Sequence, residues 1–156
     1  MGQIPSRVIV GFVEHSAFNG AHKKNPFNFK NFGITKVSLQ LDAQEQPVRP
    51  IHCNFADGLY AEAYMSLFSG TGKAFKDEDI DVTREDYANG YTLFCFDLTP
   101  DLGESDHYSL VKTGSVRLGV TFANALTATV NAIVYAEFQN VLEIDRNRNV
   151  FYDFSA

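Results

Sequence analysis

The sequence has little cysteine, no tryptophan and no long apolar run, and these scarcities exclude several classes of protein. Two cysteines in 156 residues are too few for the disulfide framework of a small secreted domain, although one bridge between Cys53 and Cys95 stays open. Cys95 lies in an apolar run, so we expect a buried thiol there. Nothing approaches the roughly 18 apolar residues of a membrane span, and the first fifteen residues lack the apolar core of a signal peptide. These features indicate a reducing compartment inside the cell.

Basic residues are also scarce, and the formal net charge is -6. A surface that binds nucleic acid needs clustered Lys and Arg to displace the counterions of the phosphates. The most basic feature is the pair Lys23 and Lys24, which we interpret as a solvated loop tip. We therefore expect no direct binding of nucleic acid.

Histidine is too sparse and too scattered for a metal centre. The four histidines form no H-x-H, H-x-x-x-H or H-x-D pair, which a jelly-roll oxygenase would require; they are His15, His22, His52 and His107. The acidic stretch 77–81 has alternating carboxylates, as a calcium loop does, but Val82 occupies the position that needs glycine. We expect a solvated acidic loop, with a loose cation site as the alternative, and no metal or cofactor elsewhere.

Motifs for enzymatic chemistry are missing as well. The stretch 69–73, Ser-Gly-Thr-Gly-Lys, is similar to a phosphate-binding loop, but the upstream glycine is absent and Ala74 replaces the Ser or Thr. No G-x-S-x-G nucleophile elbow occurs. We expect a protein that is not an enzyme.

Alternating apolar residues are what the chain has in abundance, and alternation with a period of two predicts strands with one buried face. We expect strands over these ranges: 7–14, 34–42, 48–53, 91–98, 115–122, 129–138, 141–144 and 150–154. Pro47 and Pro50 confine the strand 48–53 to a sheet edge, and 44–47 is predicted as the loop before it. The stretch 145–149 should join the last two strands in a hairpin or an extended tail.

One good helix pattern occurs near the middle of the chain, at residues 58–69. Asp57 is its expected N-cap and Gly70 its expected C′ residue. Residues 70–90 should form a long loop with one helical turn from 83 to 86. About eight short strands with a single inserted helix indicate an all-β fold, an antiparallel jelly-roll β-sandwich in one domain over residues 1–156.

Several segments resemble one family in their order and spacing. They are NPFNFKNF at 25–32, LQLD at 39–42, LFSGTG at 67–72, REDY at 84–87, NGY at 89–91, FDLTPDL at 96–102, VYAEF at 134–138 and EIDRNRNV at 143–150. Together they resemble the C-terminal part of the hexon-like major capsid proteins of Polinton/Maverick elements and adintoviruses. Members of that family tend to have glycine directly after the Leu-Asp pair at 41–42, whereas Ala43 stands here, so the turn should differ.

The resemblance implies a double jelly-roll capsid protein, of which 156 residues hold one jelly roll: one half of the double fold, or a stand-alone captured copy. It further implies trimeric capsomers that tile an icosahedral shell with other capsid proteins, assembled in the cytoplasm or nucleus of a host cell.

The C-terminal segment provides the candidate assembly contacts, because Arg and aromatic residues are enriched at interfaces. The candidates are Arg146, Arg148, Phe151, Tyr152 and Phe154. Two alternatives stay open. The aromatic residues of this segment could complete the core of their own sandwich. The whole chain could instead be a host-domesticated jelly-roll binding module, lectin-like or a protein-interaction domain.

Overall fold

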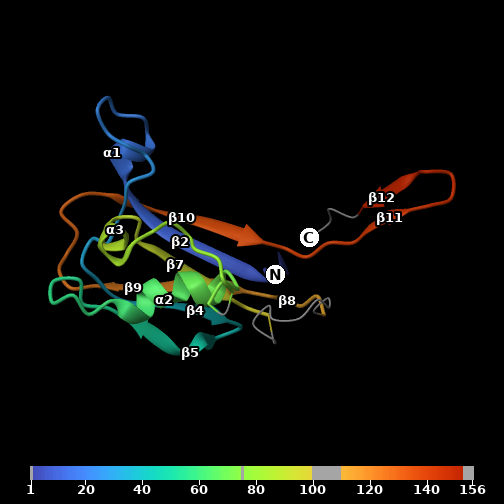
Figure 1. The fold of residues 1–156 in the computed structure, drawn as a ribbon, viewed down its shortest axis with the longest axis horizontal. Helices are drawn as coiled ribbons and strands as arrows, with labels where there is room; N and C mark the ends of the chain where they lie inside the picture. Colours follow the sequence, from blue (N-terminus) through green and yellow to red (C-terminus); the bar gives the residue numbers. More distant parts are fainter. Residues whose placement is uncertain (1, 75, 100–109, 153–156) are drawn as a thin grey trace.

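The computed structural model describes residues 2–74, 76–99 and 110–152, which form an all-β sandwich with few helices (Figure 1). Every pair of strands within its sheets is antiparallel. One main sheet has the order β10 (Val130–Glu137), β2 (Arg7–Glu14), β7 (Leu93–Asp97). The other has the order β5 (Gln44–His52), β4 (Ile34–Leu41), β9 (Val116–Phe122).

The remaining elements are short. Three small ladders pair β1 (Gly2–Gln3) with β8 (Thr113–Gly114), β3 (Phe29–Lys30) with β6 (Asn89–Gly90), and β11 (Leu142–Ile144) with β12 (Val150–Tyr152). The described helices are α1 (His15–Phe18), α2 (Ala61–Gly70) and α3 (Arg84–Ala88). None of them is long and apolar enough to cross a membrane.

Early strands pair with late strands in both main sheets. β2 runs against β10 over its whole length, from Arg7 opposite Glu137 to Glu14 opposite Val130. In the same way β4 runs against β9. The chain is thus folded back on itself as a long nested hairpin, and the two sheets are stacked face to face.

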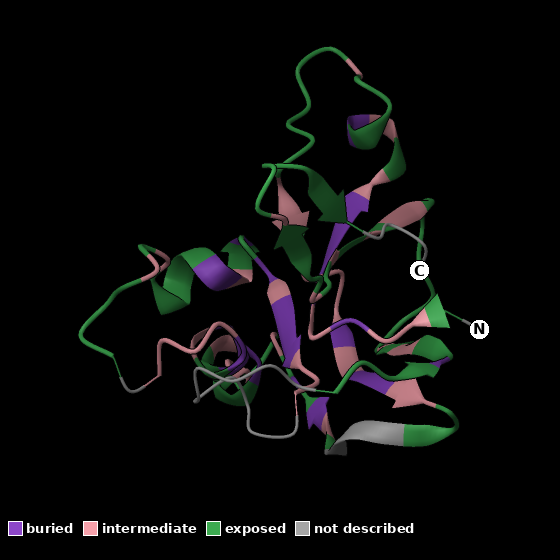
Figure 2. Ribbon diagram, turned by 90° about the vertical axis from the view of Figure 1, so that its right-hand side faces the viewer, coloured by how far each residue is buried: buried purple, intermediate pink, exposed green. Residues whose placement is uncertain are grey.

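The core lies between the two sheets and contains buried residues from both, which are purple on the ribbon in Figure 2. Phe12 of β2 is at its centre: its ring meets Phe94 of β7 edge-on at 6.4 Å and Phe122 of β9 at 6.3 Å between ring centroids. Such edge-to-face pairs are a favoured geometry for aromatic rings. Phe12 therefore joins the two sheets.

One side of the sandwich is closed by α2, which packs on β7 and β5. Ala63 and Leu67 are the helix's buried apolar residues. Aromatic rings continue this cover: Tyr64 contacts Phe68 and Tyr87 edge-on, and the Tyr64 hydroxyl donates to the Val82 carbonyl at 2.8 Å. The rings and this hydrogen bond fix the long loop after α2 to the body.

Most expected strands are confirmed, with ends shifted by up to two residues, except that β5 begins at Gln44 and not at 48. The range 7–14 is the observed β2, and 115–122 and 129–138 each lose one or two terminal residues in β9 and β10. β5 is an edge strand, as its prolines predict. The expected helical turn is α3, capped by the Thr83 side chain, which accepts from the Asp86 amide. The last two strands form the expected hairpin.

Four local predictions are wrong. Residues 44–47 are not a loop, because the chain turns earlier, at Asp42 and Ala43, which have φ of 48° and 72°. The main helix begins at Ala61 rather than 58, and Asp57 does not cap it, because the Asp57 carboxylate accepts from the Asn54 side-chain amide at 2.7 Å instead. Gly70 is the last residue of the helix, so it is not at C′.

Candidate assembly interface

The C-terminal hairpin, residues 141–152, projects from the body of the sandwich (Figure 1), and we call it the arm. Asp145 shapes its turn: one carboxylate oxygen accepts from the backbone amides of Asn147 and Asn149 at 2.7 and 2.8 Å, and the other accepts from the Asn149 side chain at 2.7 Å. These bonds stabilise the charged carboxylate and lower the pKa of Asp145. The turn is therefore well defined although the arm is exposed.

The arm is apolar on one face. Side chains alternate along a strand, so Leu142 and Ile144 share a face with their partners across the ladder, Tyr152 and Val150. The other face pairs Glu143 with Phe151. All six are exposed, and the five apolar ones among them keep 49–65% of their surface in solvent. Exposed apolar patches are candidate interaction surfaces.

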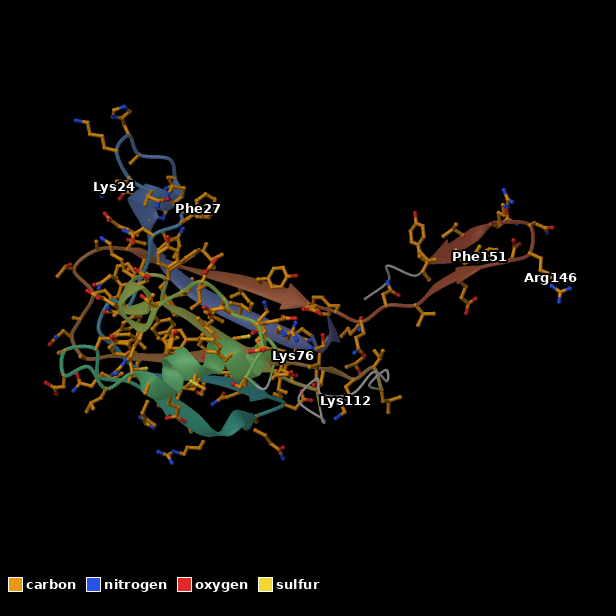
Figure 3. All side chains as sticks on the ribbon, viewed as in Figure 1. Lys24, Phe27, Lys76, Lys112, Arg146 and Phe151 are labelled. Carbon is orange, nitrogen blue, oxygen red and sulfur yellow. The ribbon has the colours of Figure 1, made fainter. Side chains whose placement is uncertain are left out.

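The structure places four of the five predicted contact residues on the arm, as Figure 3 shows for Arg146 and Phe151. Arg146 and Arg148 belong to the turn, and Phe151 and Tyr152 belong to β12. Phe154 lies outside the described residues. Phe151 and Tyr152 are more than half exposed, so the alternative that they complete the core is wrong. Their role in assembly stays a prediction.

A second apolar feature, which we call the groove, lies between β10 and β9. It is a cavity of about 300 Å³ lined by residues of both sheets and of the N-terminal segment: Gln3, Pro5, Val8, Val10, Leu39, Val116, Leu118, Val134, Ala136 and Phe138. Val8, Val10 and Leu39 are buried at its floor, whereas Val134 and Phe138 are about half exposed at its rim. The sandwich is thus not covered on this side: an apolar depression with an exposed rim lies over a buried floor.

Both strands that border the groove are sheet edges. In the part of the chain that the structure describes, β10 has a neighbour in β2 alone and β9 has one in β4 alone. An edge strand directs half of its backbone N–H and C=O groups away from its sheet, and such an edge is a template for another strand. On the other side of the sandwich, α2 packs on β7 and β5 and covers them. The open side was missed by the sequence analysis: alternation marks Val116 and Val134 as inward-facing but does not say which strands end a sheet.

The chemistry-bearing residues do not converge elsewhere in the described chain. Cys53 and Cys95 are free and buried, and burial raises the pKa of each thiol to about 12. No group of three or more His, Cys, Asp and Glu residues that could hold a metal ion is found within 2–74, 76–99 and 110–152. In the acidic loop, Lys73 forms an ion pair with Glu78 at 3.4 Å and donates to the Asp79 carbonyl.

The chain resembles an uncharacterized protein of Caenorhabditis elegans, F54H12.2. The two are 31% identical over 155 residues, which is 97% of this chain and 37% of the nematode protein. The chain therefore spans little more than a third of the length of the curated relative that it matches. No family model matches the sequence, and no solved structure matches it.

Proposed function

We propose that the chain is a structural subunit that self-associates into capsomers of a virus-like shell, as the resemblance to hexon-like major capsid proteins implies. The observation that carries the proposal is the presence of two apolar surfaces on one chain: an arm that projects into solvent, and an apolar groove between two edge strands. Closed assemblies need only complementary surfaces and symmetry, and the chain carries both halves of such a contact.

The jelly-roll fold is part of this proposal. In a jelly roll, strands near the start of the chain pair with strands near its end, and the two sheets wrap around one core. The pairs β2–β10 and β4–β9 are nested in this way. The main sheets have three strands each, whereas an eight-stranded jelly roll has four in each. One further strand on β10 and one on β9 would complete that arrangement.

Light scattering after size-exclusion chromatography, over a range of concentrations, tests the proposal. We expect masses that are multiples of the 17.4 kDa chain, with a three-copy species, and ring- or shell-like particles in negative-stain images. A single 17.4 kDa species at every concentration would overturn self-association and would favour the alternative of a monomeric binding module.

A further inference from the structure

We infer that the arm of one copy binds in the groove of a second copy, so that copies are joined by exchanged hairpins. The inference rests on the proposed function, since it names the surfaces by which the chain self-associates. The two surfaces belong to the same chain, and each is exposed although it is apolar.

The arm matches the groove and the free edge of β10 in size and in backbone hydrogen bonding. The free edge of β10 is eight residues long, and the arm offers a strand of three residues on each side of its turn. A strand added to a sheet edge satisfies the backbone groups of both partners, while alternate side chains enter the pockets beside it. The groove of about 300 Å³ is many times larger than the roughly 10–15 Å³ that a single water needs, so side chains of the arm can enter it.

The distribution of charge favours a contact between the arm of one copy and the body of another. Arg146 and Arg148 balance Glu143 and Asp145, so the arm has no net charge, and the formal charge of -6 belongs to the rest of the chain. Two bodies brought together edge to edge would repel each other. A neutral arm that carries two arginines at its tip meets no such repulsion at an acidic body.

The path of the chain directs the arm to another copy. The Ser6 amide donates to the Glu137 carbonyl at 2.8 Å, and the Gln3 side chain donates to the Gln139 carbonyl at 3.0 Å. These bonds hold the chain beyond β10 against the N-terminal segment. The arm consequently leaves the end of the sandwich and extends away from the body (Figure 1), whereas the groove is lined by β2, β4, β9 and β10 within that body.

A contact between an arm and a groove is heterologous, because each copy gives one surface and receives on a different one. Repetition of such a contact produces a ring when the rotation closes and a filament when it does not. A closed ring would leave no arm and no groove unoccupied, and a ring of three copies would agree with the trimer that the family resemblance implies.

Complementation between two full-length variants tests the inference. Leu142→Thr with Ile144→Thr removes apolar side chains from the arm and places there a β-branched residue, a type that strands favour. Val134→Asp places a charge at the rim of the groove. Each variant alone should be monomeric. An equimolar mixture should form dimers that contain one copy of each, because only one intact arm and one intact groove remain.

Two control variants match these changes. Leu59→Thr alters a side chain as exposed as Ile144, at 66% against 65%, beside the α2 side of the body. Tyr135→Asp places the same charge on β10 one residue further, on the face away from the groove. Both controls should assemble like the unaltered chain. Circular dichroism should show that all four variants are folded, because each change is at an exposed position.

The outcomes separate this inference from the proposed function. If the unaltered chain assembles and the arm and groove variants still do so, or if their mixture stays monomeric, the arm does not bind the groove of a second copy, although self-association stands. An arm that folds back onto its own groove would also leave the mixture monomeric. If the unaltered chain is itself monomeric, the proposed function fails first.

A cysteine pair gives an independent readout. Ile144→Cys in one copy and Val134→Cys in another should form an intermolecular disulfide when the two proteins are mixed under mild oxidation, and neither should form it with Leu59→Cys. The native thiols do not interfere, because Cys53 and Cys95 are buried. A mixture without the cross-link, in a sample that does assemble, would contradict the inference.

Discussion

Gly70 lies so close to Cys95 that a Cβ atom added to the glycine would stand 2.6 Å from the cysteine Sγ and 3.1 Å from its backbone carbon. The last residue of α2 is therefore glycine because β7 passes directly beside it. Gly70→Ala should lower the free energy of unfolding by about 1–3 kcal/mol through overpacking. The sign of this change in stability is informative, because replacing glycine by alanine at an uncrowded helix position would stabilise the helix by about 1 kcal/mol. Urea unfolding measures the difference.

Ser69→Ala is the control for this change, because Ser69 is the exposed neighbour of Gly70 in the same helix. It should alter the free energy of unfolding by no more than about 0.5 kcal/mol, as surface substitutions usually do. A Gly70→Ala protein as stable as this control would show that α2 does not pack on β7 as closely as the structure has it.

Phe12 joins the two sheets, and its removal should test the sandwich itself. Phe12→Ala should cost about 3–5 kcal/mol, since it removes the ring that meets both Phe94 and Phe122 and leaves a cavity. Phe18→Ala is the matched control, because the Phe18 ring is about half exposed beyond the end of β2. Equal losses of stability for the two variants, measured by thermal or urea unfolding, would contradict the stacking of the sheets.

Ala43 occupies a left-handed conformation, with φ of 72°, in the turn between β4 and β5. A non-glycine residue in this region destabilises the fold by roughly 1–2 kcal/mol. Glycine avoids this cost, but part of the gain is lost because glycine gives the unfolded chain more conformational entropy. Ala43→Gly should therefore stabilise the protein by about 0.5–1 kcal/mol. Ala128→Gly, at an exposed loop position without positive φ, should not stabilise it. A loss of stability in Ala43→Gly would mean that the chain turns elsewhere.

Alternation of apolar and polar residues was sufficient to predict the strands whose inner faces are buried. In β9, Leu118, Val120 and Phe122 pack on the core and alternate with more polar neighbours, so both the strand and its inner face could be predicted. The turn at 42–43 was missed because it lacks the Asn-Gly or Asp-Gly signal of a two-residue hairpin. Its geometry is supported from far along the chain instead, since the Asp42 carboxylate accepts from the Ser115 amide at 2.9 Å.

The candidate interface could be predicted only in part. Arg146 and Phe151 belong to residue types enriched at interfaces, but their alternating pattern suits a buried strand as well as an exposed arm. Where the groove lies depends on which strands end each sheet. That order is set by pairings between residues far apart in the chain, such as Val10 with Val134 and Leu41 with Val116, and local patterns do not encode it.

The two thiols should make stability depend on pH at alkaline values. Burial raises the pKa of Cys53 and of Cys95 from 9.0 to about 12, so the folded chain keeps protons that the unfolded chain releases. Stability falls with pH wherever the folded state binds more protons than the unfolded state. The contribution of the thiols is therefore fully present below about pH 9 and is lost as pH rises toward 12. Burial raises the pKa of Tyr87 too, which acts in the same direction.

Urea unfolding at a series of pH values from 7 to 11 measures this effect. The midpoint should fall above pH 9, and the fall should be shallower in a Cys53→Ala, Cys95→Ala double variant, because only Tyr87 and other groups then titrate. A thiol reagent should modify neither cysteine at pH 8 in the folded chain and both in urea, since only a thiolate that solvent reaches can react. Rapid modification of the folded chain, or an equal pH dependence in the double variant, would show that the two thiols are not buried.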